Sequence, residues 1–415
     1  MRHHRLILLS VFFASSAFAA ETAKVLPKNI FRARVVGIQT EAVSDRYNDQ
    51  GLLEGFTTGL NRTVTVADLV AKSPDLGRLV NTLNSLQPGL GSQLLNANIY
   101  NSFEQTQRQW IPALEYGITD RSTIGIRVPI VRRTVRTRFW VDSNNQAYQT
   151  ALAIGAINPD VQTGLKTFQD TGFGTQFFAA SLFTDKGYQV PEDFDVTEMG
   201  DVEIGYKFNF YKNNHWLLST GIGARAPTGS TAALDNIFDK GSGTGAWGVG
   251  SAWYEAYQPA SWFVATAMQK FTYSFPDRRD RAVPRDENDS LPSVRPQDGQ
   301  VQSVLREQTA MLEMEISGTF YMFETALSTW GAYQYANKGK DRYTGAGNLY
   351  YAGLAKGTDY EKHNGEIGIG YSTIPAFRRG QFKVPAEFNL LYNTTIDGKN
   401  TPLTSYVRMD MMMYF

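Results

Sequence analysis

The sequence predicts an all-β fold: a transmembrane antiparallel β-barrel of about twelve strands, with long, partly helical extracellular loops. Three observations predict this fold. The chain starts with an export signal, has no later apolar run long enough for a membrane helix, and alternates apolar with polar residues over many short segments. Alternation with a period of two gives a strand one apolar and one polar face. Such a strand can separate lipid from water.

The first nineteen residues have the pattern of a secretory signal peptide. Arg2 and Arg5 make a positive start, residues 6–13 are apolar, and Ala17 and Ala19 supply the small residues that precede a cleavage site. We therefore expect residues 1–19 to be removed and residues 20–415 to form a single barrel domain. A retained anchor is the alternative, but the apolar run is too short to span a bilayer.

The composition excludes several classes of protein. Lys plus Arg total 40, as do Asp plus Glu, so no basic excess predicts a nucleic-acid partner. The absence of cysteine excludes a lipoprotein and disulfides. Beyond the signal, no apolar run approaches the roughly 20 residues of a transmembrane helix, so the mature chain is either soluble or crosses a membrane as strands. The 37 glycines and the 13% aromatic residues favour strands.

The last twelve residues give the clearest strand pattern. One face carries two charges and the other carries none; the faces read Tyr406, Arg408, Asp410, Met412, Tyr414 and Val407, Met409, Met411, Met413, Phe415. The uncharged face suits lipid and the charged face suits a watery interior. The segment resembles the C-terminal strand of outer-membrane proteins, and this resemblance implies that the barrel-assembly machinery reads the terminal Phe415.

Similar alternation recurs along the chain and predicts twelve strands. Short turns and long polar links alternate between them, as expected when short turns face the periplasm and long loops face outward. An even count leaves both chain ends in the periplasm, and closure leaves no unpaired sheet edge in lipid. The predicted strands are 31–46, 105–118, 123–139, 197–210, 215–226, 244–257, 262–275, 303–320, 325–339, 363–373, 383–394 and 404–415.

Three long links have distinct character. The segment 47–104 contains an apolar spacing over 64–87 that predicts two short helices separated by Pro74. The segment 141–196 holds an apolar stretch at 148–190, which we expect to be buried against the barrel rim or folded into the barrel mouth as a constriction. The segment 276–302 is charged and rich in proline, and we expect a mobile surface loop.

The polar faces of the predicted strands supply candidate lumen residues. Glu115 and Arg127 lie on either side of the 119–122 turn, so a cross-strand ion pair between them is plausible. Two interpretations stay open: an ion-paired interior that closes the barrel, or a polar lining that controls permeation. The candidates are Glu115, Arg127, Asp201, Glu203, Lys207, Arg225, Glu313, Glu315, Glu366, Glu387, Arg408 and Asp410.

Aromatic residues near the predicted strand ends are expected to lie at the membrane interface, where amphipathic rings are favoured. They are Trp110, Trp216, Trp247, Trp253, Trp262, Tyr414 and Phe415. No catalytic site, metal site or cofactor is predicted. The mature chain has two histidines, His215 and His363, in positions that suit neither a metal site nor the serine–histidine pair of an outer-membrane phospholipase.

The middle of the chain resembles a known family. The segments GDVEIGYKFNF (200–210), LSTGIGARAPTGS (218–230), GTGAWGVGS (243–251) and the hairpin LEYGITDRSTIGIRVP (114–129) are similar to outer-membrane barrels associated with the meta-pathway of phenol degradation. That family is related to the long-chain fatty-acid transporters. The resemblance implies passive uptake of small, often aromatic or hydrophobic, molecules.

One departure concerns gating. The fatty-acid transporters plug the barrel with an N-terminal hatch, whereas only about ten mature residues precede the first predicted strand here. We therefore expect any gate to come from 47–104 or 141–196.

The sequence thus predicts a barrel in the outer membrane of a Gram-negative bacterium, in contact with membrane lipid and lipopolysaccharide, acting as a channel for small hydrophobic or aromatic solutes. Two alternatives stay open: a structural or surface-exposed barrel with a blocked lumen, serving adhesion or envelope integrity, and a polar-solute channel.

Overall fold

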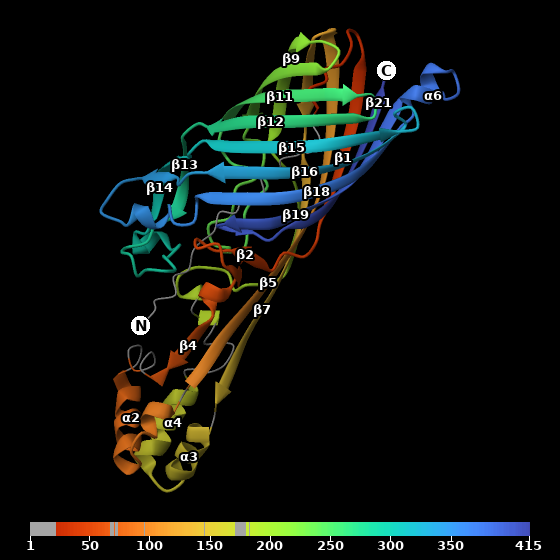
Figure 1. Ribbon diagram of the computed structural model, residues 1–415. Coiled ribbons are helices and arrows are strands. Elements are labelled where there is room, and N and C mark those ends of the chain that lie inside the picture. The colour runs from red at the N-terminus through yellow and green to blue at the C-terminus, as the bar shows by residue number, and fades with distance from the viewer. Residues whose placement is uncertain are drawn as a thin grey trace.

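A computed structural model describes residues 22–66, 70, 74–94, 96–144, 146–170, 180–181 and 183–415. Its main feature is a closed barrel of twelve antiparallel strands, which confirms the predicted fold class (Figure 1). The predicted signal peptide and most of the first helix predicted within 64–87 lie outside the described residues. Within the described part of the chain, no helix is long and apolar enough to cross a membrane.

The barrel closes because the first strand pairs with both the last strand and the second. Around the barrel the strands are β1 (Phe31–Thr40), β5 (Asn96–Thr119), β6 (Ser122–Arg127) with β7 (Ile130–Asn144), β9 (Val202–Lys212) with β8 (Phe194–Met199), β10 (Trp216–Ala226), β11 (Gly248–Ala260), β12 (Phe263–Ser274), β15 (Met311–Met322), β16 (Leu327–Lys338), β18 (Tyr360–Ser372), β19 (Ala386–Lys399) and β21 (Ser405–Tyr414).

Two adjacent barrel strands are interrupted at the same level. Strand β6 ends before Pro129 and β7 begins after it, while β8 and β9 are separated at Gly200 and Asp201. Proline has no N–H to donate to a ladder. The amide of Gly200 still donates to the carbonyl of Pro129 at 2.8 Å, so the wall stays joined there. The predicted strands 123–139 and 197–210 are therefore each divided in two.

The outer face of the barrel is apolar, as the alternation predicted. Ile222 is 64% exposed, Ile367 66% and Met409 56%, although each lies within a barrel strand. Their neighbours on the opposite face are buried, with Arg408 and Asp410 on either side of Met409 only 1% and 3% exposed. Exposed apolar side chains arranged around a barrel that buries its charges form a surface suited to lipid.

Strands β5 and β7 continue beyond the barrel as a two-stranded ribbon (Figure 1). Their pairing runs from Trp110 with Ile130 out to Asn96 with Asn144, whereas β1 reaches only as far as Arg108 along β5. The short strand β4 (Arg62–Thr65) pairs with the far end of β5. This ribbon was not predicted, since the alternation of apolar and polar residues placed the start of the strand at residue 105.

Three helices pack together at the far end of the ribbon: α2 (Pro74–Leu86), α3 (Gln146–Gly155) and α4 (Pro159–Asp170) (Figure 1). Helix α2 confirms the second helix predicted within 64–87. Leu79 and Leu83 of α2 share one apolar cluster with Ala151 of α3 and Leu165 of α4. In the described part of 148–190 the apolar side chains are buried, as predicted, but largely within the helical tip and not against the barrel rim or in the mouth; residues 171–179 and 182 lie outside the described residues.

The segment 276–302 was expected to be mobile, but it forms ordered structure outside the barrel. Strands β13 (Asp277–Ala282), β14 (Val301–Glu307) and β17 (Arg342–Thr344) make a three-stranded sheet. Val283 and Val304 are both fully buried beneath it. The apolar residues in this charged segment supply a small core, which the count of prolines and charges conceals. Consequently the barrel strand predicted at 303–320 begins only at Met311.

The remaining elements are short. Strands β2 (Asp45–Tyr47), β3 (Leu53–Gly55) and β20 (Thr401–Pro402) form a second small sheet. Helix α6 (Ile374–Arg378) occupies the periplasmic turn between β18 and β19. Single-turn 3₁₀ helices are η1 (Thr58–Leu60), η2 (Gly91–Gln93), η3 (Pro296–Asp298) and η4 (Tyr351–Gly353).

Candidate functional site: the cavity of the barrel lumen

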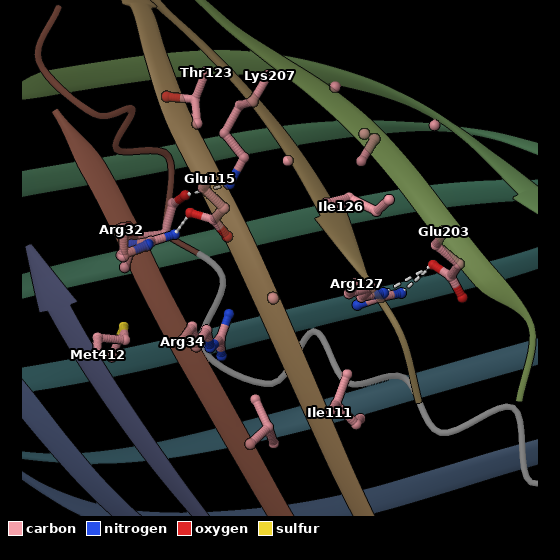
Figure 2. A pocket seen from close by; sticks show the side chains of 18 of the residues that line it. Arg32, Arg34, Ile111, Glu115, Thr123, Ile126, Arg127, Glu203, Lys207 and Met412 are labelled. Atoms are coloured by element: carbon pink, nitrogen blue, oxygen red, sulfur yellow. Dashed lines mark hydrogen bonds and ion pairs between the residues drawn. The ribbon is translucent and has the colours of Figure 1, made fainter. Parts of the chain in front are cut away.

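A cavity of about 840 Å³ occupies the barrel lumen. Its lining extends from Lys240 and Thr244, in the extracellular link between β10 and β11, to Ile374 and Phe377 in the periplasmic turn. Figure 2 shows part of the wall, where side chains from neighbouring strands point into the same space. The cavity therefore reaches both ends of the barrel.

Four adjacent strands present a row of glycines to this cavity. Gly125 of β6 is paired with Gly205 of β9, which is paired with Gly223 of β10, which is paired with Gly250 of β11. All four line the cavity, while neighbouring residues such as Ile222 face outward. A Cβ added at Gly205 would meet no atom nearer than 3.7 Å. Around Gly205 and Gly223 the wall of the lumen thus carries no side chain, whereas the side chain of Glu115 lies over Gly125.

The charged residues of the wall are largely joined in cross-strand ion pairs. Lys270 contacts Glu313 at 2.6 Å, and Arg225 contacts Asp201 at 3.7 Å. Figure 2 shows two further pairs, Arg32 with Glu115 and Arg127 with Glu203. Pairing reduces the net charge that a permeating solute meets. Cations on β1 and β12 complete some of these pairs, and Arg32, Arg34 and Lys270 were not among the predicted lumen residues.

The predicted ion pair between Glu115 and Arg127 was wrong in its partners. Glu115 lies directly opposite Gly125, so Arg127 is displaced from it by two residues along β6. Glu115 instead pairs with Arg32 of β1, and Arg127 pairs with Glu203 of β9, where the Nε–Oε2 distance is 3.0 Å. Each side chain reaches toward a different neighbouring strand. Sequence spacing across a turn suggests only one of these neighbours.

A hydrogen-bonded network fills another part of the interior, on β16, β18 and β19. Glu366 is 3% exposed and accepts hydrogen bonds from Trp330 Nε1 at 3.1 Å, Gln334 Nε2 at 3.2 Å and Asn393 Nδ2 at 3.2 Å. Gln334 also donates to Glu315 at 3.0 Å. Low dielectric strengthens such a network when its members are satisfied. This sector matches the interpretation in which lumen charges hold the barrel together.

The strand β21 completes that sector. The Oδ2 atom of Asp410 lies 2.9 Å from Nη2 of Arg34 and 2.8 Å from Nη2 of Arg408, so Asp410 forms ion pairs with both arginines. Arg408 is almost fully buried. Three of the predicted lumen residues, Glu366, Arg408 and Asp410, therefore face inward but are absorbed in buried contacts. The other nine line the open cavity: Glu115, Arg127, Asp201, Glu203, Lys207, Arg225, Glu313, Glu315 and Glu387.

Asp201 holds an extracellular loop over the cavity. Its carboxylate accepts hydrogen bonds from the amide of Gly229 at 3.0 Å and from the amide and hydroxyl of Thr244, both at 2.8 Å. Asp201 stands at the interruption between β8 and β9, which aims it at the loop. It therefore positions residues 240–244, which line the mouth of the cavity.

A second carboxylate fixes the same loop. Asp239 accepts a hydrogen bond from Arg133 of β7 at 2.9 Å. Burial opposes ionisation, but the amides of Ala233 and Gly241 and the Arg133 guanidinium hold the pKa of Asp239 below its ordinary value. The loop is thus tied to β7 by a charge-assisted contact.

Lys240 lines the cavity beside this contact. Its ammonium lies 5.4 Å from the ring centroid of Phe56, within cation–π range. Burial, together with repulsion from Arg46 and Arg133, lowers the pKa of Lys240 to about 8. The lumen mouth therefore carries a cation that can lose its proton near neutral pH. No sequence motif marks it.

The described N-terminal residues also lie inside the barrel. Ala23 and Leu26 are 1% and 4% exposed, and the segment 22–30 contributes to the cavity wall. The amide of Leu26 donates to the Thr123 hydroxyl at 2.7 Å, and the Ser219 hydroxyl donates to the Ala23 carbonyl. The premise that too few residues precede the first strand to enter the barrel was therefore wrong, and a gate at 47–104 or 141–196 stays a prediction. A short segment is long enough to reach the interior because it runs back into the lumen directly from β1.

Six of the seven predicted interface aromatics have exposed rings: Trp110, Trp216, Trp247, Trp253, Trp262 and Phe415. Tyr414 is the exception. It faces the cavity, and its hydroxyl donates to Glu387. The alternation of β21 places Tyr414 on the same face as Arg408 and Asp410. The ring therefore points into the lumen although the residue lies at the strand end.

His215 and His363 lie apart. His215 contacts the carbonyl of Gln258 in a periplasmic turn, and His363 contacts Glu361 on β18 at 3.0 Å. Across the described ranges, no group of three or more potential ligands is placed to hold a metal ion.

No protein-family model and no curated protein sequence matches the chain. Among solved structures, the chain resembles an outer-membrane channel from Pseudomonas putida F1, with a TM-score of 0.52 and 12% identity over 96% of this chain and 99% of that one. Weaker similarity is found to a Pseudomonas aeruginosa FadL homologue (TM-score 0.33, 10% identity, 94% and 90% covered). The Pseudomonas putida toluene transporter TodX gives a TM-score of 0.32 at 8% identity, with 100% and 97% covered.

The first of these similarities shows a shared fold, and the other two carry no argument. Together with the apolar outer face, the fold identifies the chain as an outer-membrane β-barrel protein.

Proposed function

We propose that this outer-membrane barrel is a passive channel for small hydrophobic or aromatic solutes. The observation that carries the proposal is the cavity, whose lining runs from the extracellular loop at Lys240 to the periplasmic turn at Phe377. A barrel that served only as a scaffold would be expected to fill this space with side chains. The chain instead places four glycines in register on one side of it.

The character of the wall supports an uncharged solute. Apolar residues such as Val36, Ile111, Val131 and Met412 line the cavity between the ion pairs. Because most charged side chains of the wall are neutralised in ion pairs, an uncharged solute can pass without breaking those pairs. The motif resemblance to barrels of the phenol-degradation meta-pathway extends the proposal to aromatic compounds. We propose no catalytic activity for the barrel. We also propose that the barrel-assembly machinery recognises the terminal Phe415, which is 66% exposed, when it inserts the protein into the membrane.

The experiment is single-channel recording of the purified mature protein in planar bilayers, with and without phenol or benzyl alcohol. We expect a steady conductance that these aromatics reduce in a concentration-dependent way. Absence of conductance, with no effect of the aromatics on thermal stability, would support the blocked, structural barrel instead. Swelling of proteoliposomes in arabinose, without any effect of aromatics on the current, would support a polar-solute channel.

A further inference from the structure

The outer face of the β5–β7 ribbon carries a ladder of arginines immediately above the apolar band. The last apolar pair is Trp110 opposite Ile130, and the next outward-facing pair is Arg108 opposite Arg132. Two residues of strand separate these pairs, a rise of roughly 7 Å. Like charges directly opposite each other destabilise a strand pair, so this position favours an external anion.

Two more arginines continue the ladder. Arg136 is opposite Glu104, and Arg138 is opposite Ser102, with all four side chains exposed on the same face. Among the described residues, neither Arg136 nor Arg138 has an ion pair. The ladder has guanidinium groups at positions 108, 132, 136 and 138. These four cations therefore outnumber the carboxylates that could neutralise them.

Two of the acidic groups nearby are already engaged, whereas Glu104, opposite Arg136, supplies the ladder with one further carboxylate. Asp195 contacts Arg132 at 2.6 Å, and Asp193 accepts a hydrogen bond from the amide of Thr137 at 2.7 Å. Within the described part of the chain, Arg108 Nε donates to the amide oxygen of Gln39, and its guanidinium group also interacts electrostatically with Asp195. Guanidinium groups bind phosphate through two parallel hydrogen bonds, and the ladder retains free donors for that purpose.

An aromatic pair ends the ladder at its upper limit. The rings of Tyr100 and Trp140 are stacked, with centroids 5.4 Å apart, and Trp140 is 45% exposed. From the membrane outward, the surface is thus apolar at Trp110, cationic along the arginines, and aromatic at Trp140. In lipopolysaccharide the acyl chains, the phosphorylated glucosamine disaccharide of lipid A and the core sugars follow one another in the same order.

We propose that the arginine ladder, defined by Arg108, Arg132, Arg136 and Arg138, binds the phosphorylated headgroup of an outer-leaflet glycolipid, the lipid A part of lipopolysaccharide. The acyl chains lie against Trp110 and Ile130, the phosphates of the glucosamine disaccharide contact the guanidinium groups, and the core sugars attached to lipid A stack on the Tyr100–Trp140 pair. The bound lipid would brace the base of the ribbon that carries α2, α3 and α4. This inference requires the barrel to lie in the outer membrane and does not depend on the channel function.

The test is native mass spectrometry of the full mature protein in detergent with bisphosphorylated lipid A. The test variant is Arg136→Gln/Arg138→Gln, which breaks no ion pair of the described structure. The matched control is Arg78→Gln/Arg342→Gln, which removes the same charge from extracellular side chains that are 82% and 77% exposed. Heat-modifiable electrophoretic mobility verifies that each variant is a folded barrel.

We expect the test variant to bind lipid A at least tenfold more weakly than the wild type, and the control to bind it normally. Dephosphorylated lipid A should bind weakly to all three proteins. The proposal is overturned if the two double variants lose binding equally, or if removing the phosphates leaves wild-type binding unchanged. Competition by millimolar inorganic phosphate as effective as that by lipid A would also overturn it, because the site would then recognise free phosphate. Unchanged conductance of the test variant would show that its loss of lipid A binding is independent of the proposed channel function.

Discussion

Gly205 and Gly223 lie directly opposite each other on β9 and β10, and both face the lumen. A side chain at either position would project into the cavity, because the strand period turns their neighbours toward lipid. Gly331 of β16 provides the opposite case. It lies beside the inward-facing Trp330 and so faces outward, and an added Cβ there would meet no atom nearer than 3.9 Å.

Replacement of Gly205 by leucine should narrow the channel. We expect single-channel conductance to fall roughly twofold or more, since the cross-section of a pore sets its conductance. Gly331→Leu adds the same side chain toward lipid and should leave conductance unchanged. Equal conductance in both variants would contradict the placement of the glycine row along the permeation path.

The N-terminal segment should restrict the periplasmic half of the lumen. Deletion of residues 22–27 after an intact signal peptide removes Val25 and Leu26 from the cavity wall. We expect conductance to rise and its fluctuations to decrease, as recorded in planar bilayers. Lys28→Gln, at an exposed position, is the control. A deletion variant that inserts normally and conducts like the wild type would show that the segment is no obstacle.

Glu366 should contribute strongly to stability. Its replacement by alanine leaves the donors of Trp330, Gln334 and Asn393 buried without this acceptor. Each unsatisfied buried donor costs on the order of 1–3 kcal/mol, so we expect a loss of roughly 3 kcal/mol after relaxation. Urea unfolding in detergent, followed by tryptophan fluorescence, measures the change. Glu104→Ala, at an exposed site on the ribbon, should change stability by less than about 0.5 kcal/mol.

Charge selectivity should depend on pH near 8. The lowered pKa of Lys240, about 8, means that the residue is protonated at pH 6.5 and largely neutral at pH 9.5. The lumen mouth thus loses one positive charge as pH rises, and the preference for anions should decrease over that interval. Reversal potentials in a salt gradient measure this preference. In Lys240→Met the preference should start lower, and a pH dependence that persisted unchanged would assign the titration to another group.

The barrel strands could be predicted because each has one apolar face toward lipid and one polar face toward the interior, which gives its sequence a period of two. In β21, Met409 and Arg408 alternate so strictly that both the face and the extent of the strand follow from the residues. The ribbon was missed for the same reason. Beyond Arg108 the outer face of β5 meets solvent, so Glu104 and Ser102 show no apolar face that would extend the predicted strand.

The contacts of the site were harder to predict because they depend on three-dimensional register. Glu115 has neighbours on both β1 and β6, and only the register shows that Arg32 is the one it reaches. The segment 22–30 has no periodicity of its own. Ala23 is buried against Tyr254 and Met268, more than 200 residues away in the chain, so no local pattern reports its place in the lumen.

The internal N-terminal segment has a consequence for the order of assembly. Strand β1 pairs with β21 from Arg32 to Thr40, and this seam joins the first and last strands of the barrel. Ala23 and Leu26 precede β1 directly and are enclosed by the wall that the seam completes. Entry of the segment is therefore least hindered before the seam is sealed, while the last strand is still being added. A bulky fusion at the mature N-terminus would then delay closure itself, and its effect would appear as slow barrel maturation.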